Sequence, residues 1–130
     1  IDLDKRYKKK NKNLNCINSK NINFDKLNKS KIITVLIDQK STTSKMIVVF
    51  LNKKCSFHST QIKYAIKNNR DIYISYNIIN NKKIINKYIK IEIKNKELKE
   101  ICQDIANKFM NIILKYPEQY LWLHNRFNIS

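Results

Sequence analysis

The sequence predicts an α/β fold in which helices pack on a mixed β-sheet. Three observations favour this class. Short runs of β-branched residues occur early in the chain, two later segments alternate between apolar and polar residues, and one long segment carries apolar residues at helical spacing. Because strands and helices alternate along the chain, we expect a sheet with helical cover.

The first elements are expected between residues 31 and 69. Residues 31–37 and 46–51 are short runs rich in isoleucine, valine and leucine, with the length of buried strands. A helix is expected over 56–69, because Ile62 and Ile66 lie four residues apart and form a modest apolar stripe.

The segments 71–78 and 88–93 have the alternation of half-buried strands, with isoleucines on one side and polar residues on the other. A polar stretch at 80–83 reads as the turn between them, so the pair predicts an antiparallel hairpin. This hairpin makes the expected sheet mixed and not purely parallel.

The longest predicted helix covers 97–116. Asn95 is a suitable N-cap, and Pro117 ends the helix because it lacks a backbone N–H. One broad stripe of apolar residues at helical spacing faces the core: Leu98, Ile101, Cys102, Ile105, Phe109, Ile112 and Ile113.

The composition limits the possible partners. The chain has 27 basic and 10 acidic residues, a net charge of +17, which favours anionic partners such as acidic phospholipid, nucleic acid or a phosphorylated substrate. Glycine is absent, and asparagine can replace it in turns because it tolerates the left-handed region. The three cysteines lie far apart and without zinc spacing, so we expect no metal and no cofactor. No apolar run is long enough to span a membrane, so we expect any membrane contact to be peripheral or to be made through a segment outside this chain.

The most distinctive segment follows the long helix and holds the only proline and the only tryptophan. It reads Tyr116-Pro117-Glu118-Gln119-Tyr120-Leu121-Trp122-Leu123-His124-Asn125-Arg126-Phe127. This block closely resembles the C-terminal signature of the lipid A biosynthesis acyltransferases of the lauroyl/myristoyl type. Asp38-Gln39, after an apolar run, is similar to an Asp-Gln segment of the same family. The resemblance extends over residues 25–128.

The resemblance implies an enzyme that transfers a fatty acyl chain from an acyl carrier protein thioester to a phosphorylated glucosamine lipid, the lipid A precursor. It implies a place at the cytoplasmic face of the bacterial inner membrane, with peripheral contact to anionic lipid and no specific nucleic acid. Asp38 and Gln39 are then expected at a substrate cleft, and His124 and Arg126 at an anionic head group.

The family's catalytic motif, His-x-x-x-x-Asp/Glu, is absent from this sequence. The fifth residue after His58 is Lys63, and the fifth after His124 is Ile129. We therefore expect residues 25–130 to be the C-terminal half of an acyltransferase domain, preceded at 1–24 by a basic segment that is poorly ordered or partial. The isolated chain is expected to be inactive.

Two other hypotheses stay open on the sequence. The net charge, the run Lys8-Lys9-Lys10 and the scattered aromatic residues also suit a small basic nucleic-acid-binding domain, although arginine is scarce and no known nucleic-acid motif appears. Salt-titrated binding to DNA or RNA would test that alternative. The missing catalytic motif is also compatible with a decayed gene remnant.

Overall fold

The computed structural model describes residues 24–36 and 45–122. The chain divides into two compact units, residues 1–34 and 35–130. In the first unit, the described residues form one short helix, α2 (Phe24–Lys29). All the other elements belong to the second unit, which contains β1 (Ile47–Phe50), β2 (Lys53–Ser56), α3 (Thr60–Lys67), β3 (Ile72–Asn80), β4 (Lys83–Ile91), α4 (Leu98–Lys115) and the 3₁₀ helix η1 (Pro117–Gln119).

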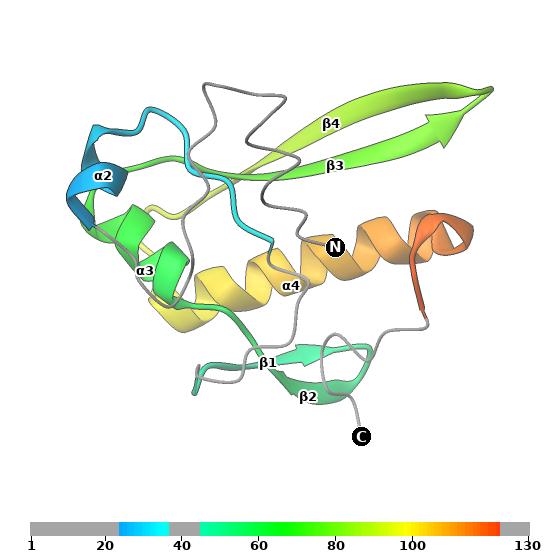
Figure 1. Ribbon diagram of the computed structural model, residues 1–130. Coiled ribbons are helices and arrows are strands. Elements are labelled where there is room, and N and C mark those ends of the chain that lie inside the picture. Colours follow the sequence, from blue (N-terminus) through cyan, green and yellow to red (C-terminus); the bar gives the residue numbers. More distant parts are fainter. Residues whose placement is uncertain (1–23, 37–44, 123–130) are drawn as a thin grey trace, which may run out of the picture. The chain divides into compact units, whose positions relative to one another are not determined.

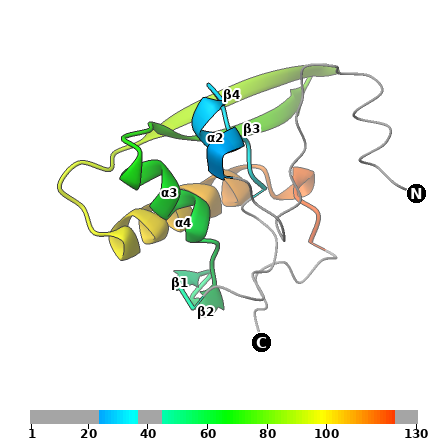
Figure 2. The same cartoon turned by 60° about the vertical axis from the view of Figure 1, so that its left-hand side comes forward.

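The expected α/β class is confirmed. Where the sequence suggested one mixed sheet, the described strands form two antiparallel pairs, β1 with β2 and β3 with β4. In the second unit, α4 lies between these two hairpins, with β3–β4 on one side and β1–β2 on the other (Figure 1). A view turned by 60° shows the same order of layers (Figure 2).

The hairpin β3–β4 confirms the alternation seen in the sequence. Its register pairs Ile72 with Ile91 and Asn80 with Lys83, which leaves Asn81 and Lys82 as a two-residue turn. Both turn residues have positive φ, 48° and 62°, as the turns favoured in tight hairpins require. Asparagine therefore takes a position here that glycine often occupies in other proteins.

The hairpin β1–β2 was only half predicted. Phe50 pairs with Lys53, so Leu51 and Asn52 form the turn, with φ of 49° and 62°. The chain then returns as β2, in the stretch between the end of the expected strand at residue 51 and the expected helix start at residue 56. As a consequence α3 begins at Thr60, later than the expected start at residue 56.

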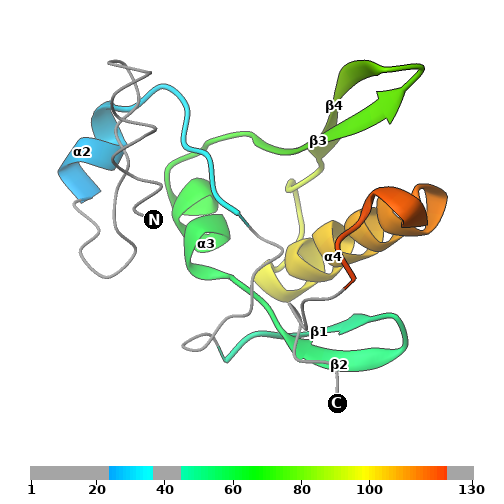
Figure 3. The same ribbon diagram turned by 45° about the vertical axis from the view of Figure 1, so that its right-hand side comes forward.

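The helix α3 ends as expected at Asn68 and Asn69. Asn69 has a φ of 50°, and its N–H donates to Ile66 O at 3.2 Å, while the N–H of Arg70 donates to Ala65 O at 2.9 Å. This pair of bonds is a Schellman motif, which satisfies carbonyls that the helix end would leave unpaired. A view turned by 45° shows α3 beside the first turns of α4 (Figure 3).

The expected strand at 31–37 is wrong for the residues that the structure describes. Lys31–Leu36 has no regular structure, Ile37 lies outside the described residues, and the side chain of Ile32 is 83% exposed. A β-branched run becomes a strand only when another strand satisfies its backbone groups. Among the described strands, none pairs with this segment.

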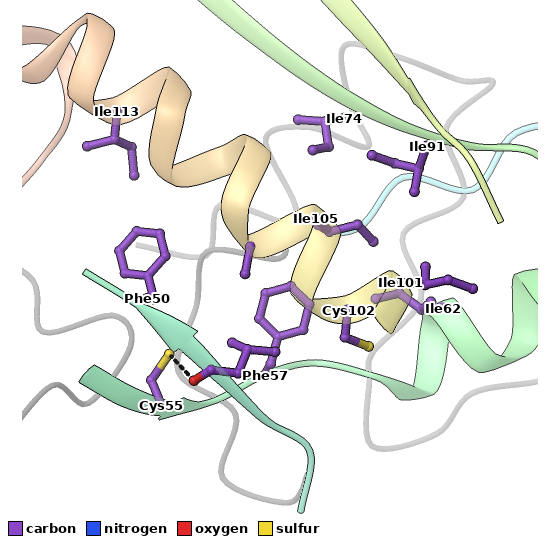
Figure 4. Close-up of a cluster of buried hydrophobic side chains, with 12 residues drawn as sticks. Phe50, Cys55, Phe57, Ile62, Ile74, Ile91, Ile101, Cys102, Ile105 and Ile113 are labelled. Atoms are coloured by element: carbon purple, nitrogen blue, oxygen red, sulfur yellow. Dashed lines mark hydrogen bonds between the residues drawn. The ribbon is translucent and has the colours of Figure 1, made fainter. Parts of the chain in front are cut away.

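The core of the second unit is built around α4, whose apolar stripe is wide enough to face both hairpins. In Figure 4, Phe50 and Phe57 lie on one side of α4, while Ile74 and Ile91 lie on the other. The least exposed large side chains belong to this cluster: Val48, Phe50, Phe57, Ile91, Ile101, Cys102 and Ile105. The predicted stripe of α4 is thereby confirmed.

Candidate functional site

The residues predicted to bind substrate, Asp38, Gln39, His124 and Arg126, lie outside the described residues. The site is therefore described through the part of the terminal block that the structure shows, residues 116–122, and through the elements which that part contacts.

A sharp change of direction follows α4. Pro117 cannot donate the next helical hydrogen bond, and the chain tightens into η1, where the N–H of Gln119 donates to Tyr116 O at 3.0 Å. The predicted end of the long helix at Pro117 is confirmed. The turn brings the residues after it back toward the body of the second unit.

Gln119 fastens the block to β3 through two hydrogen bonds. The N–H of Ile79 donates to Gln119 Oε1 at 2.8 Å, and Gln119 Nε2 donates to Ile79 O at 3.1 Å. These are the two bonds that a neighbouring strand would make with that residue. The side-chain amide therefore occupies one position along the outer edge of β3, an edge that would otherwise offer unpaired backbone groups.

Gln103 of α4 makes the same kind of contact with the other hairpin. The N–H of Val49 in β1 donates to Gln103 Oε1 at 2.8 Å, and Gln103 Nε2 donates to Val49 O at 2.8 Å. The sequence analysis missed both glutamine clamps. The only sequence feature that could have drawn attention to Gln119 was its position in the distinctive block. Gln103 has no such feature, because it is one of several polar residues on an amphipathic helix.

A chain of aromatic rings connects the block to the core. Ring centroids are 5.1 Å apart for Trp122 and Tyr120, 6.1 Å for Tyr120 and Phe109, and 6.3 Å for Phe109 and Phe50. The first two pairs meet edge to face, a favoured arrangement for aromatic rings. Trp122 Nε1 also donates to Pro117 O at 2.7 Å. Tyr120 and Trp122 therefore take part in packing, while Phe127 lies outside the described residues.

The thiols of the core are unsuited to nucleophilic chemistry. Burial raises the pKa of the Cys102 thiol to about 11 and raises the pKa of the Cys55 thiol above its ordinary value. Both side chains are free and buried, so at neutral pH they stay protonated and shielded. In the described part of the chain, no group of three or more His, Cys, Asp or Glu residues is arranged to hold a metal ion.

Fold and contacts together define a small α/β unit onto which the described part of the C-terminal aromatic block, residues 116–122, is packed. The model of the bacterial lipid A biosynthesis acyltransferase family matches residues 4–128, and the chain belongs to that family. No curated protein and no solved structure matches it. Within residues 24–36 and 45–122, no helix is both long and apolar enough to cross a membrane.

Proposed function

We propose that this chain is the C-terminal part of an acyltransferase domain that transfers a fatty acyl chain from an acyl carrier protein thioester to a phosphorylated glucosamine lipid. The observation that carries the proposal is the family match over residues 4–128. The described terminal block supports it, because Gln119 and Tyr120 hold the distinctive segment on β3 and α4. The described part of the distinctive block, residues 116–122, is thus packed onto the unit.

The proton-abstracting group must come from residues outside this sequence. Transfer to a hydroxyl needs a base that removes the hydroxyl proton as the oxygen attacks the thioester carbon. Neither His58 nor His124 has a carboxylate five positions later. We infer that a preceding half of the domain supplies the His-x-x-x-x-Asp/Glu pair, with residues 25–130 as the second half and 1–24 as a basic segment that is poorly ordered or partial.

The substrate contacts are assigned by the same proposal. We propose that Asp38 and Gln39 bind at the substrate cleft and orient the acceptor hydroxyl, and that Arg126 and His124 bind the phosphate of the acceptor lipid. Arginine suits this task because its guanidinium forms paired bonds with phosphate oxygens. The Lys-rich surface attracts the acidic acyl carrier protein. We propose that the enzyme acts at the cytoplasmic face of the bacterial inner membrane, where the acceptor lipid lies.

The test joins this chain to the N-terminal half of an active family member that carries the His-carboxylate pair. With acyl carrier protein thioester and lipid A precursor, the 130-residue chain alone should give no transfer and the fusion should give turnover. Replacement of the supplied histidine by alanine should abolish that turnover. Arg126→Ala should weaken acceptor binding, whereas Lys99→Ala, on the exposed side of α4, should leave it unchanged.

Two results would contradict the proposal. Robust transfer by the chain alone would show that the base lies within these residues. A folded fusion that binds neither substrate would show that the chain does not form the substrate half of the domain.

A further inference from the structure

One edge of the hairpin β3–β4 presents a row of outward-facing backbone groups. The bonds between Gln119 and Ile79 show which groups face outward, because the N–H and the C=O of Ile79 both point away from β4. In an antiparallel pair, residues that bond across the pair alternate with residues whose backbone groups face away from it. By the register, the residues of β4 that face away from β3 are Ile84, Asn86, Tyr88 and Lys90.

The backbone groups of these four residues have no hydrogen-bond partner within residues 24–36 and 45–122. The other hairpin edges differ, because a glutamine clamp occupies one position on β1 and one on β3. An uninterrupted row of unpaired donors and acceptors is a template on which another strand can pair. The edge of β4 therefore offers such a template along most of its length.

Exposed apolar side chains flank this edge on both faces of β4. Ile84 and Tyr88 are on the outer face and are 71% and 65% exposed, while Ile85, on the inner face, is 38% exposed. Ile78, the cross-strand partner of Ile85 on the same inner face, is only 6% exposed. The ribbon views agree with this difference, because β3 lies between β4 and the C-terminal end of α4 (Figure 1, Figure 3). In the turn half of the hairpin, the cover given by α4 does not extend to β4.

The charges on β4 indicate the chemistry of a partner strand. Residues 82–91 include four lysines and neither aspartate nor glutamate. Lys90 is paired, because its Nζ lies 3.0 Å from Asp71 Oδ2. Lys83 and Lys87 are exposed on the inner face and have no ion pair with any residue that the structure describes. Opposite charges on neighbouring strands are favourable, so the edge suits a strand that carries carboxylates beside these lysines and aliphatic residues between them.

We propose that the edge of β4 accepts a β-strand from the preceding half of the acyltransferase domain, so that the hairpin becomes part of a larger sheet. The inference rests on the proposed function, in which that half supplies the His-carboxylate pair and must be joined to this unit. Backbone hydrogen bonds along the edge hold the added strand, and its side chains cover the exposed apolar residues of β4. A third strand also stabilises the hairpin, because two strands alone are only marginally stable.

One other occupant and one other edge fit less well. A second copy of the chain would bring the lysines of two β4 strands together, and like charges across an interface are unfavourable. On the edge of β3, Gln119 already occupies Ile79. The outward residues that remain there form a shorter row, in which a single large apolar side chain is exposed: Tyr73, Ser75 and Asn77.

Hydrogen exchange tests the inference on the fusion described above, in which the N-terminal half of an active family member precedes the full 130-residue chain. In the chain alone, the outward amides of β4 should exchange rapidly: Ile84, Asn86 and Tyr88. In the fusion they should exchange at least about tenfold more slowly, because each then donates to the added strand. The amides of Ser75 and Asn77, on the opposite edge, should exchange at the same rate in both proteins.

A proline on each strand separates the two edges. Asn86→Pro removes an outward N–H and no bond within the hairpin, so it should block the added strand and leave the hairpin intact. Asn77→Pro is the matched control, because Asn77 is the cross-strand partner of Asn86 and its N–H faces the opposite edge. With the two halves as separate chains, N86P should lower their affinity at least about tenfold, whereas N77P should stay within about twofold. Circular dichroism confirms that each variant is folded.

A charge variant tests the same edge without a change of backbone. K83Q/K87Q should lower the affinity between the two halves about fivefold, because each exposed ion pair contributes only modestly. K63Q/K67Q removes the same charge from exposed positions on α3 and should stay within about twofold of the unchanged chain. Equal losses in the two variants would show attraction by net charge alone and would overturn the choice of this edge.

Acyl transfer by the fusion is recorded separately, so the two proposals can fail independently. Transfer without protection of the β4 amides would overturn the strand inference and leave the proposed function intact, whereas protection without transfer would do the reverse. Unprotected β4 amides overturn the strand inference whether or not transfer occurs. It would also be overturned by β4 amides that are already protected in the chain alone, by a loss in N77P as large as that in N86P, or by a dimer of the chain alone that N86P dissociates.

Discussion

At the scale of single residues, the side-chain amide of Gln119 fixes where the terminal block lies. It binds both backbone groups of Ile79, 40 positions earlier in the chain. No pattern in the sequence indicates such a pairing, because the partner is a backbone group and any residue provides one. The distinctive block could be recognised from its residue types, but its attachment point on β3 required the fold.

Replacing Gln119 by glutamate should remove one of the two bonds and place a carboxylate oxygen against Ile79 O. We expect the free energy of unfolding to fall by about 1 kcal/mol, because both groups are exposed and water partly replaces the lost bond. Hydrogen exchange at the Ile79 amide should become faster, because repulsion between the new carboxylate oxygen and Ile79 O displaces the side-chain oxygen that accepts the Ile79 N–H. Gln103→Glu is the matched control: it should speed exchange at Val49 and leave Ile79 unchanged. Unchanged exchange at Ile79 in Q119E would contradict the clamp.

The buried thiol of Cys102 should make stability depend on alkaline pH. Its pKa is raised to about 11 in the folded state, so between the ordinary thiol value of about 8.5 and 11 the unfolded chain loses the proton first. The stabilisation is therefore fully present below about pH 8.5 and is lost as pH rises, by about 1.4 kcal/mol per pH unit. Urea denaturation at several pH values should show this decline, and C102A should show a smaller one. Parallel curves for the two proteins would exclude the thiol as its cause.

At the scale of elements, periodicity decided what could be predicted. The helix α4 and the hairpin β3–β4 carry long, regular patterns, and both were predicted to within a few residues. The return strand β2 was missed because Leu51, a residue not typical of tight turns, takes a φ of 49°, and because Lys53–Ser56 shows no alternation. The strand expected at 31–37 failed for the opposite reason, since its pattern is suitable but no described strand pairs with it.

The N-cap of α4 lies two residues later than the sequence predicted, and the backbone shows why. The sequence analysis chose Asn95 as the N-cap, but Asn95 has a φ of 58° and the helix is capped at Glu97. The N–H of Glu97 donates to Glu100 Oε2 at 2.7 Å, one half of a capping box. The sequence signal for this cap was the presence of two glutamates, Glu97 and Glu100, at the spacing of a capping box.

Glu100→Ala should lower the free energy of unfolding by about 0.5–1 kcal/mol, because the Glu97 N–H loses its acceptor and the helix start loses a negative charge. Glu100→Gln separates the two effects, since its amide oxygen still accepts the bond. It should cost less than half as much in thermal and urea denaturation. Equal costs for the two variants would assign the whole effect to charge.

At the scale of the whole molecule, the net charge of +17 opposes folding through self-repulsion. Ion pairs such as Lys90–Asp71 offset little of it, because they are exposed. The three lysines at the turn of β3–β4 add to the repulsion without a carboxylate close by among the described residues.

Sodium chloride should therefore stabilise this chain. Raising the concentration from about 0.01 M to about 0.1 M shortens the screening length from about 30 Å to about 10 Å, and the midpoint of thermal unfolding should rise by several degrees. The variant K82Q/K83Q/K87Q removes three of the 17 net charges, so it should be more stable than the unchanged chain at low salt, with the difference shrinking as salt is added. Chloride is the suitable anion, because sulfate and phosphate also strengthen apolar burial. A midpoint that falls with salt would mean that attractive ion pairs outweigh the repulsion.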